Sequence, residues 1–153
     1  MRRAAQACAL ALAALVVWTR PAAAIDVCTL PSVEAVVFAG YDPIGGGAVD
    51  TTGSVTYHCT GAPETITISL SRGGGASWFP RALTSGAHAL GYNLFLDAAR
   101  TAVWGDGTGG TSVWQETATI DQNTTLTVFG RIPAGQNPHV GSYGDSIVVT
   151  ISY

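Results

Sequence analysis

The 153-residue sequence contains no lysine, and three of its seven arginines lie within the first twenty residues. Beyond residue 24, four arginines stand against ten aspartates and glutamates, which gives a net charge of −6 with histidine neutral. A chain with so few cations has no basic surface for the phosphates of nucleic acids or for anionic lipid headgroups. Neither is therefore an expected partner.

The sequence also lacks the motifs of an enzyme. No Gly-x-Ser-x-Gly elbow occurs, and the three histidines lie far apart along the chain. Asp97, Asp106 and Asp121 fall at strand ends or in turns, where local hydrogen bonds favour aspartate, so turn roles are favoured over sugar or calcium ligation. We expect no catalytic residues, no cofactor and no metal site.

The N-terminal region has the pattern of a secretory signal peptide. Two arginines follow Met1, an apolar run covers residues 4–18, and small residues precede a cleavage site after Ala24. The apolar run is shorter than the roughly 20 residues that a membrane-spanning helix needs. We therefore expect a signal peptide at residues 1–24, an exported domain at residues 25–153 and no stable membrane insertion.

Only two cysteines, Cys28 and Cys59, remain after that cleavage. An even number of cysteines in an exported domain favours a disulfide. Metal binding by the pair is a much weaker alternative, because no CxxC spacing or neighbouring histidine cluster supports it. We expect a Cys28–Cys59 disulfide.

After Cys28, short segments of alternating polarity are separated by glycine-rich turns, and no window sustains a helical period. This pattern predicts an all-β domain with two packed antiparallel sheets. The expected strands cover residues 33–41, 49–59, 65–71, 89–97, 101–104, 112–120, 125–132 and 143–153.

The last of these segments has the clearest alternation, and it runs to the end of the sequence. Its predicted inward face carries four large residues: Ile147, Val149, Ile151 and Tyr153. Such a strand either is held in a sheet or is offered to a partner.

Several segments together resemble the spore coat protein U family, whose domain also forms subunits of archaic, Csu-type chaperone-usher pili. The resemblance covers residues 28–153. Its most specific segments are residues 38–43 (FAGYDP), 55–59 (VTYHC), 80–81 (PR), 92–100 (YNLFLDAAR), 103–108 (VWGDGT), 129–136 (FGRIPAGQ) and 141–145 (GSYGD).

The resemblance implies an incomplete immunoglobulin-like β-sandwich that lacks its last strand. In the family, a periplasmic chaperone fills the resulting groove, and the N-terminal strand of a neighbouring subunit then replaces it. The expected groove and chaperone contact lies along Ile147, Val149, Ile151 and Tyr153. The expected function is a non-enzymatic structural or adhesive subunit of a pilus or spore-coat-type layer, with a role in adhesion and biofilm formation. Its expected partners are the chaperone, an outer-membrane usher and other pilin subunits, and it would pass through the periplasm to the cell surface.

One feature departs from the family pattern. If cleavage follows Ala24, only Ile25, Asp26 and Val27 precede Cys28, which is too short a segment for a donor strand. We therefore expect a subunit that accepts a strand without donating one and that occupies a filament end. An unassembled surface protein and a coat role remain open.

The alternative hypothesis is a freestanding secreted carbohydrate-binding sandwich. In that case Trp78, Trp104 or Trp114 would stack on a sugar. Dependence on a chaperone distinguishes the two hypotheses.

Overall fold

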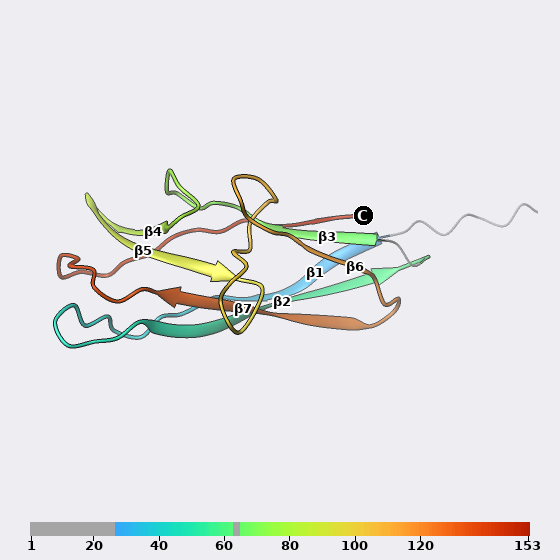
Figure 1. Cartoon of the computed structure of the whole chain (residues 1–153). Coiled ribbons are helices and arrows are strands. Elements are labelled where there is room, and N and C mark those ends of the chain that lie inside the picture. The colour runs from blue at the N-terminus through green and yellow to red at the C-terminus, as the bar shows by residue number, and fades with distance from the viewer. Residues whose placement is uncertain (1–26, 63–64) are drawn as a thin grey trace, which may run out of the picture.

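The computed structural model describes residues 27–62 and 65–153, which form two antiparallel sheets packed face to face (Figure 1). The described residues contain strands and no helix, as the sequence predicts. The expected signal peptide, its cleavage site and residues 25 and 26 lie outside the described residues.

Eight strands make up the two sheets of the described chain. They are β1 (Val27–Glu34), β2 (Val49–Thr60), β3 (Thr65–Leu70), β4 (Arg81–Ser85), β5 (His88–Phe95), β6 (Trp114–Thr117), β7 (Asn123–Ile132) and β8 (Val149–Ser152). The larger sheet has the order β1-β2-β7-β5-β4, and the smaller sheet has the order β6-β3-β8.

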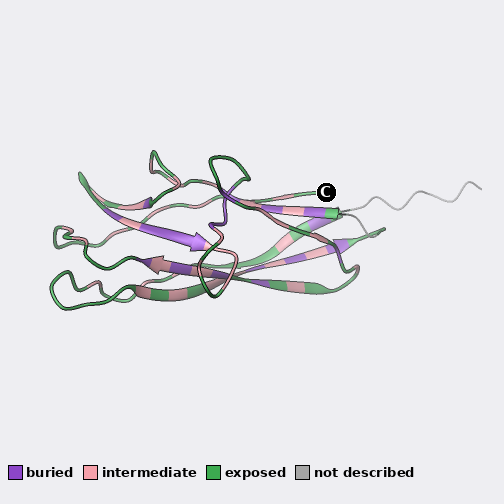
Figure 2. Ribbon diagram, in the orientation of Figure 1, coloured by how far each residue is buried: buried purple, intermediate pink, exposed green. Residues whose placement is uncertain are grey.

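Strands β2 and β7 form the longest ladder, with pairing from Val49 opposite Ile132 to His58 opposite Asn123. More buried and less buried residues alternate along most of both strands (Figure 2). Val55 and Tyr57 point inward, as the period-two pattern predicts. The alternation fixes the register, because a slip of one residue would turn the apolar set toward solvent.

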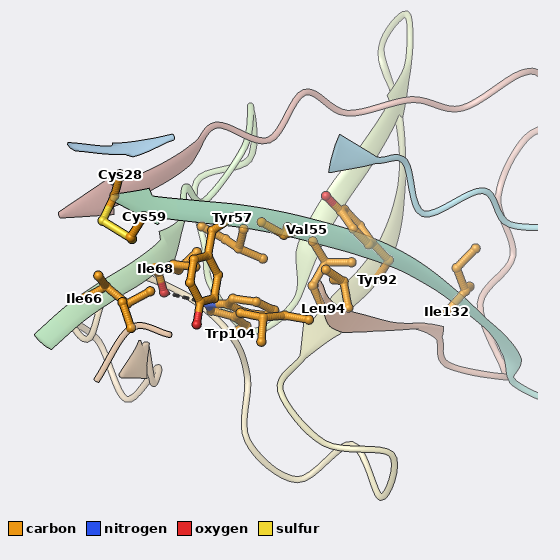
Figure 3. Close-up of a cluster of buried hydrophobic side chains, with 14 of the residues drawn as sticks. Cys28, Val55, Tyr57, Cys59, Ile66, Ile68, Tyr92, Leu94, Trp104 and Ile132 are labelled. Atoms are coloured by element: carbon orange, nitrogen blue, oxygen red, sulfur yellow. Dashed lines mark hydrogen bonds between the residues drawn. A yellow bond between two sulfur atoms is a disulfide. The ribbon is translucent and has the colours of Figure 1, made fainter. Parts of the chain in front are cut away.

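The core lies between the two sheets and is centred on Trp104, which is fully buried. Ile66, Ile68 and Leu70 of β3 supply the opposing apolar face. The indole Nε1 of Trp104 donates a hydrogen bond of 2.9 Å to the carbonyl oxygen of Ile68 (Figure 3). The only polar atom of this large side chain is therefore satisfied within the core.

Cys28 and Cys59 are bonded, with an S–S distance of 2.06 Å. They lie directly opposite one another in the pairing of β1 with β2. The disulfide therefore fastens the start of β1 to the end of β2, and the expected pairing is confirmed.

A buried guanidinium joins the two layers. Arg81 of β4 donates from Nη1 to Asn93 Oδ1 (2.9 Å) and from Nη2 to the carbonyl oxygens of Trp104 (2.6 Å) and Ser71 (3.1 Å). Its Cζ lies 4.8 Å from the centroid of the Trp78 ring. Ser71 directly follows β3, so one side chain links the β4–β5 hairpin of the larger sheet to the smaller sheet.

Strand β4 is absent from the sequence prediction. Arg81 is the most buried residue of β4, and Leu83 is its only large apolar side chain. A hydrophobic period cannot reveal a strand whose inward anchor is a charged residue.

The predicted first strand, residues 33–41, is wrong in its bounds, because β1 ends at Glu34. The chain there crosses Gly53 of β2, where a Cβ atom would lie 2.5 Å from the carbonyl oxygen of Glu34. This close crossing takes residues 35–41 out of the ladder, although Val36 and Phe38 still pack against the core.

Three later segments contain less strand than predicted. The segment at residues 112–120 contributes only β6, and residues 101–104 form isolated bridges. In the segment at residues 143–153 only β8 is a strand, because Gly144 bonds with Thr84 of β4 whereas Val149 pairs with β3. The chain thus passes from one sheet to the other before β8 begins.

Removing the disulfide should lower stability substantially. The cysteines are 31 residues apart, and opening a loop of that length costs about 3 to 4 kcal/mol in the chain-entropy model. The variant with Cys28→Ala and Cys59→Ala should show that loss in chemical denaturation. Reduced parental protein should match the variant, and equal stability of the oxidised parent and the variant would contradict the prediction.

Replacing Arg81 with lysine should also destabilise the fold. A lysine keeps the charge but cannot donate to three acceptors in the planar arrangement of the guanidinium. Unsatisfied buried acceptors should lower the free energy of unfolding by about 2 to 4 kcal/mol. Arg72→Lys is the matched control, because Arg72 is exposed. Equal denaturation midpoints for both variants would show that the guanidinium does not link the layers.

Candidate functional site

The candidate site is a groove between two sheet edges. Strand β1 ends the larger sheet and β8 ends the smaller one, so in the described chain each has only one hydrogen-bonded neighbour. The two strands contact one another but are not paired. Their free backbone N–H and C=O groups are the kind of edge to which another strand can add.

The inner part of this groove is an apolar hollow of about 230 Å³. Val33, Val36 and Phe38 line one wall, and Ile147 and Val149 line the other. Side chains from the core form its floor: Val55, Leu70, Tyr92, Leu94 and Val128. A side chain that enters here would therefore extend the existing core.

The outer part is a broader hollow of about 680 Å³. Residues 36–41 and Pro43 line one side, and residues 138–145 line the other. Both hollows include Val36, Phe38, Leu83 and Asp145, so they adjoin. We call the two together the edge groove. Along residues 33–41, an extended chain at about 3.3 Å per residue would span about 30 Å.

Asp145 fixes the wall where the two hollows meet. Its carboxylate accepts hydrogen bonds from Tyr92 Oη (2.7 Å) and from the backbone N–H groups of Gly74 and Ser146 (each 2.8 Å). Gly73 lies so close to this carboxylate that a Cβ atom would collide with it, and its φ of +78° also favours glycine. Glycine is thus required at residue 73 for this anchor.

The protonation state of Tyr92 favours its hydrogen bond to the Asp145 carboxylate. Burial and the hydrogen bond to Asp145 both raise the pKa of Tyr92, so its hydroxyl stays protonated and donates. Burial lowers the pKa of the Arg81 guanidinium, while Tyr92, Asp145 and Asp106 oppose that shift. The floor of the groove therefore lies beside two buried polar groups, the Arg81 guanidinium and the Tyr92 phenol, and the partly buried carboxylate of Asp145.

Of the four predicted groove residues, two line the edge groove and two lie outside it. Ile147 and Val149 line the inner hollow. Ile151 packs against the core outside both hollows, and Tyr153 is 55% exposed and lines neither.

Sequence reasoning missed the opposite wall, formed by Val36 and Phe38. Their spacing of two residues, in a segment predicted as a strand, was the available signal.

The three tryptophans considered for sugar stacking pack wholly or partly into the fold. Trp104 is buried, so the carbohydrate-binding hypothesis is wrong for this residue. One face of Trp78 is covered by Arg81, and Trp114 packs against the core with its ring centroid 6.5 Å from that of Trp104.

The aspartates considered as ligands hold turns instead. Asp97 accepts from the N–H groups of Thr101 and Ala102, and Asp106 accepts from the N–H and hydroxyl of Thr108. Asp121 adopts a positive φ of 56° in the turn before β7. Within residues 27–62 and 65–153, no cluster of three or more histidine, cysteine, aspartate or glutamate side chains could hold a metal ion. The same residues include no helix that could span a membrane.

Comparison with known families agrees with this geometry. The model of the Spore Coat Protein U domain matches residues 12–150 of the sequence. The chain belongs to the spore coat protein U domain family. Protein U of Myxococcus xanthus is 32% identical over 129 residues, which cover 76% of this chain and 70% of that protein.

A solved structure shares the fold of this family member. It is a chain of the chaperone–tip adhesion subunit pre-assembly complex from the archaic chaperone-usher Csu pili of Acinetobacter baumannii. The two chains superpose with a TM-score of 0.59 at 21% sequence identity. The match covers 84% of this chain and 40% of the chain in the Csu complex. The chain thus spans less than half of that neighbour, and the likeness shows the sandwich fold.

The Tyr92 anchor can be tested by Tyr92→Phe. This change leaves the ring in the core and removes the hydrogen bond to Asp145, which should lower the free energy of unfolding by about 1.5 to 3 kcal/mol. Tyr143→Phe is the control, because its hydroxyl donates to the exposed His139 carbonyl and should contribute less. Denaturation midpoints measure both, and an effect no larger than that of Tyr143→Phe would contradict the anchoring role.

Proposed function

We propose that this protein is an exported structural or adhesive subunit of a chaperone-usher surface fibre or of a spore-coat-type layer. In this proposal, the edge groove accepts a β-strand first from a periplasmic chaperone and then from a neighbouring subunit. The observation that carries it is the apolar inner hollow between the unpaired edges of β1 and β8, which continues into the outer hollow between residues 36–43 and 138–145. Membership in the spore coat protein U domain family and the shared fold of the Csu complex chain support it.

The groove has both features that strand addition needs. Free backbone groups at a sheet edge supply affinity, and pockets for alternate side chains supply specificity. Val149 combines the two, because it belongs to the edge strand β8 and its side chain lines the inner hollow. An inserted strand would cover an apolar floor that continues directly into the core.

The same feature predicts dependence on a chaperone. An open groove leaves unpaired backbone and apolar side chains in contact with water, which favours aggregation. Export through a signal peptide at residues 1–24, passage through the periplasm and delivery by an outer-membrane usher complete the proposal.

The proposal is tested by comparing two variants that place an aspartate on opposite faces of the chain at β8. Val149→Asp would place a charge in the inner hollow, whereas Val148→Asp places it on the opposite face, where Val148 is 64% exposed. The probe is a synthetic ten-residue peptide that alternates valine with threonine and ends in lysine. Because it binds the folded state, this peptide should raise the melting temperature of the parent and of the Val148→Asp variant. The melting temperature of the Val149→Asp variant should not change.

Val149→Thr controls for the possibility that Val149→Asp fails to bind only because it is unfolded. Threonine retains the shape of valine, so this variant should keep the parental circular dichroism spectrum and still bind the peptide more weakly. A parental protein that binds no strand peptide and stays monodisperse without a chaperone would contradict the proposed function. So would equal peptide binding by the Val148→Asp and Val149→Asp variants.

A further inference from the structure

The two hollows of the edge groove differ in chemistry as well as in size. The inner hollow is lined mainly by aliphatic side chains, and its volume is about 230 Å³. The outer hollow is about 680 Å³ and is bordered by four rings: Phe38, Tyr41, His139 and Tyr143. A single strand that ran through both would therefore meet two different environments.

Strand geometry assigns different side chains to these environments. Inward residues follow one another every second position, about 6.6 Å apart, so successive side chains enter successive parts of the groove. A cavity of about 150 Å³ is enough to hold one benzene ring. The inner hollow extends along residues 33–38 and 145–149, so its volume suits several small aliphatic side chains distributed along that length. The outer hollow has room for a large ring, which the surrounding rings can contact edge to face.

The charges of the groove restrict the occupant further. Glu34 lines the inner hollow, and Asp145 lines both. Among the described residues that line either hollow there is no arginine, although Arg81 beneath the groove interacts with Asp145. Glu34 accepts a hydrogen bond from the neutral Ser54 hydroxyl. An acidic side chain on the inserted strand would meet like charge in a partly desolvated site, so charge complementarity favours a neutral or cationic segment.

Two exposed valines mark the rim of the outer hollow. Val37 is 72% exposed and Val140 is 99% exposed, and both line this hollow. Ile44 is 97% exposed in a neighbouring loop and lines neither hollow. The rim is therefore an apolar surface continuous with the edge groove, and Ile44 provides an internal comparison.

We propose that the strand accepted from a neighbouring subunit carries aliphatic side chains toward the inner hollow, one aromatic side chain in the outer hollow, and no aspartate or glutamate between them. This assignment rests on the proposed function, since it specifies the occupant of the same groove. Val140 covers the aromatic ring at the rim, so it is a specificity-determining residue of the groove.

The test is a double-mutant cycle between the peptide ring and Val140. The parental peptide alternates valine with threonine over ten residues and ends in lysine. Two further peptides replace the first or the last inward valine with phenylalanine, so that either strand direction is represented. Affinities are measured by calorimetry on the parent, on Val140→Asp and on Ile44→Asp. Both substitutions are at exposed positions, so the fold should be retained.

One phenylalanine peptide should bind the parent about tenfold more tightly than the all-valine peptide, because its ring leaves water. Val140→Asp should remove most of that preference, and Ile44→Asp should leave it intact. A fourth peptide, with aspartate at a central inward position, should bind at least tenfold more weakly than the all-valine peptide.

The outcomes separate this assignment from the proposed function. If no peptide binds, the proposed function itself fails. If the valine and phenylalanine peptides bind equally, or if Val140→Asp and Ile44→Asp reduce the preference equally, strand acceptance stands and the ring assignment is overturned. Undiminished binding of the aspartate peptide would overturn the exclusion of acidic residues.

Discussion

The buried guanidinium of Arg81 is the interaction on which the two-layer arrangement depends. It donates to the carbonyl oxygens of Ser71 and Trp104 and to the amide oxygen of Asn93, so one side chain joins the turn after β3, the segment at Trp104 and strand β5. A buried charge is costly unless its hydrogen bonds are satisfied, so the network holds each of these segments in place. The sheets are thereby fastened beside β4 and β5, while the Cys28–Cys59 disulfide fastens β1 to β2 at the opposite end.

Between these two attachments, the edges of β1 and β8 remain unpaired. An ordinary sandwich would close this gap with a further strand, and its apolar side chains would complete the core. Here Val36 and Phe38 on one side and Ile147 and Val149 on the other reach toward an unfilled space. The Arg81 network and the disulfide therefore add polar and covalent links to a fold whose core is open at the groove.

The period of two in β2, β3, β5 and β7 made these strands predictable, because large apolar residues recur at every second position on their inward faces. The disulfide followed from the count of cysteines in an exported chain. Strand β4 could not be found in this way, since Arg81 is its inward anchor. Half of the candidate site also escaped, because the outer hollow joins residues 36–43 to residues 138–145, and no local pattern pairs segments so far apart in the sequence.

The anchoring of Asp145 bears on how a strand would enter. Its hydrogen bonds with Tyr92 and Gly74 hold the segment before β8 against the β4–β5 hairpin and the turn after β3, so this wall is fixed without an occupant. A preformed wall lowers the ordering cost of binding, and more of the gain from burying the strand's side chains then appears as affinity. The opposite wall, residues 35–41, lies outside the ladder with β2. It is held by the packing of Val36, Phe38 and Tyr41 against the core, and by the hydrogen bond of 2.8 Å that the Gln136 N–H donates to Tyr41 Oη. Both walls of the groove are therefore formed before a strand enters, and Asp145 keeps the β8 side in register.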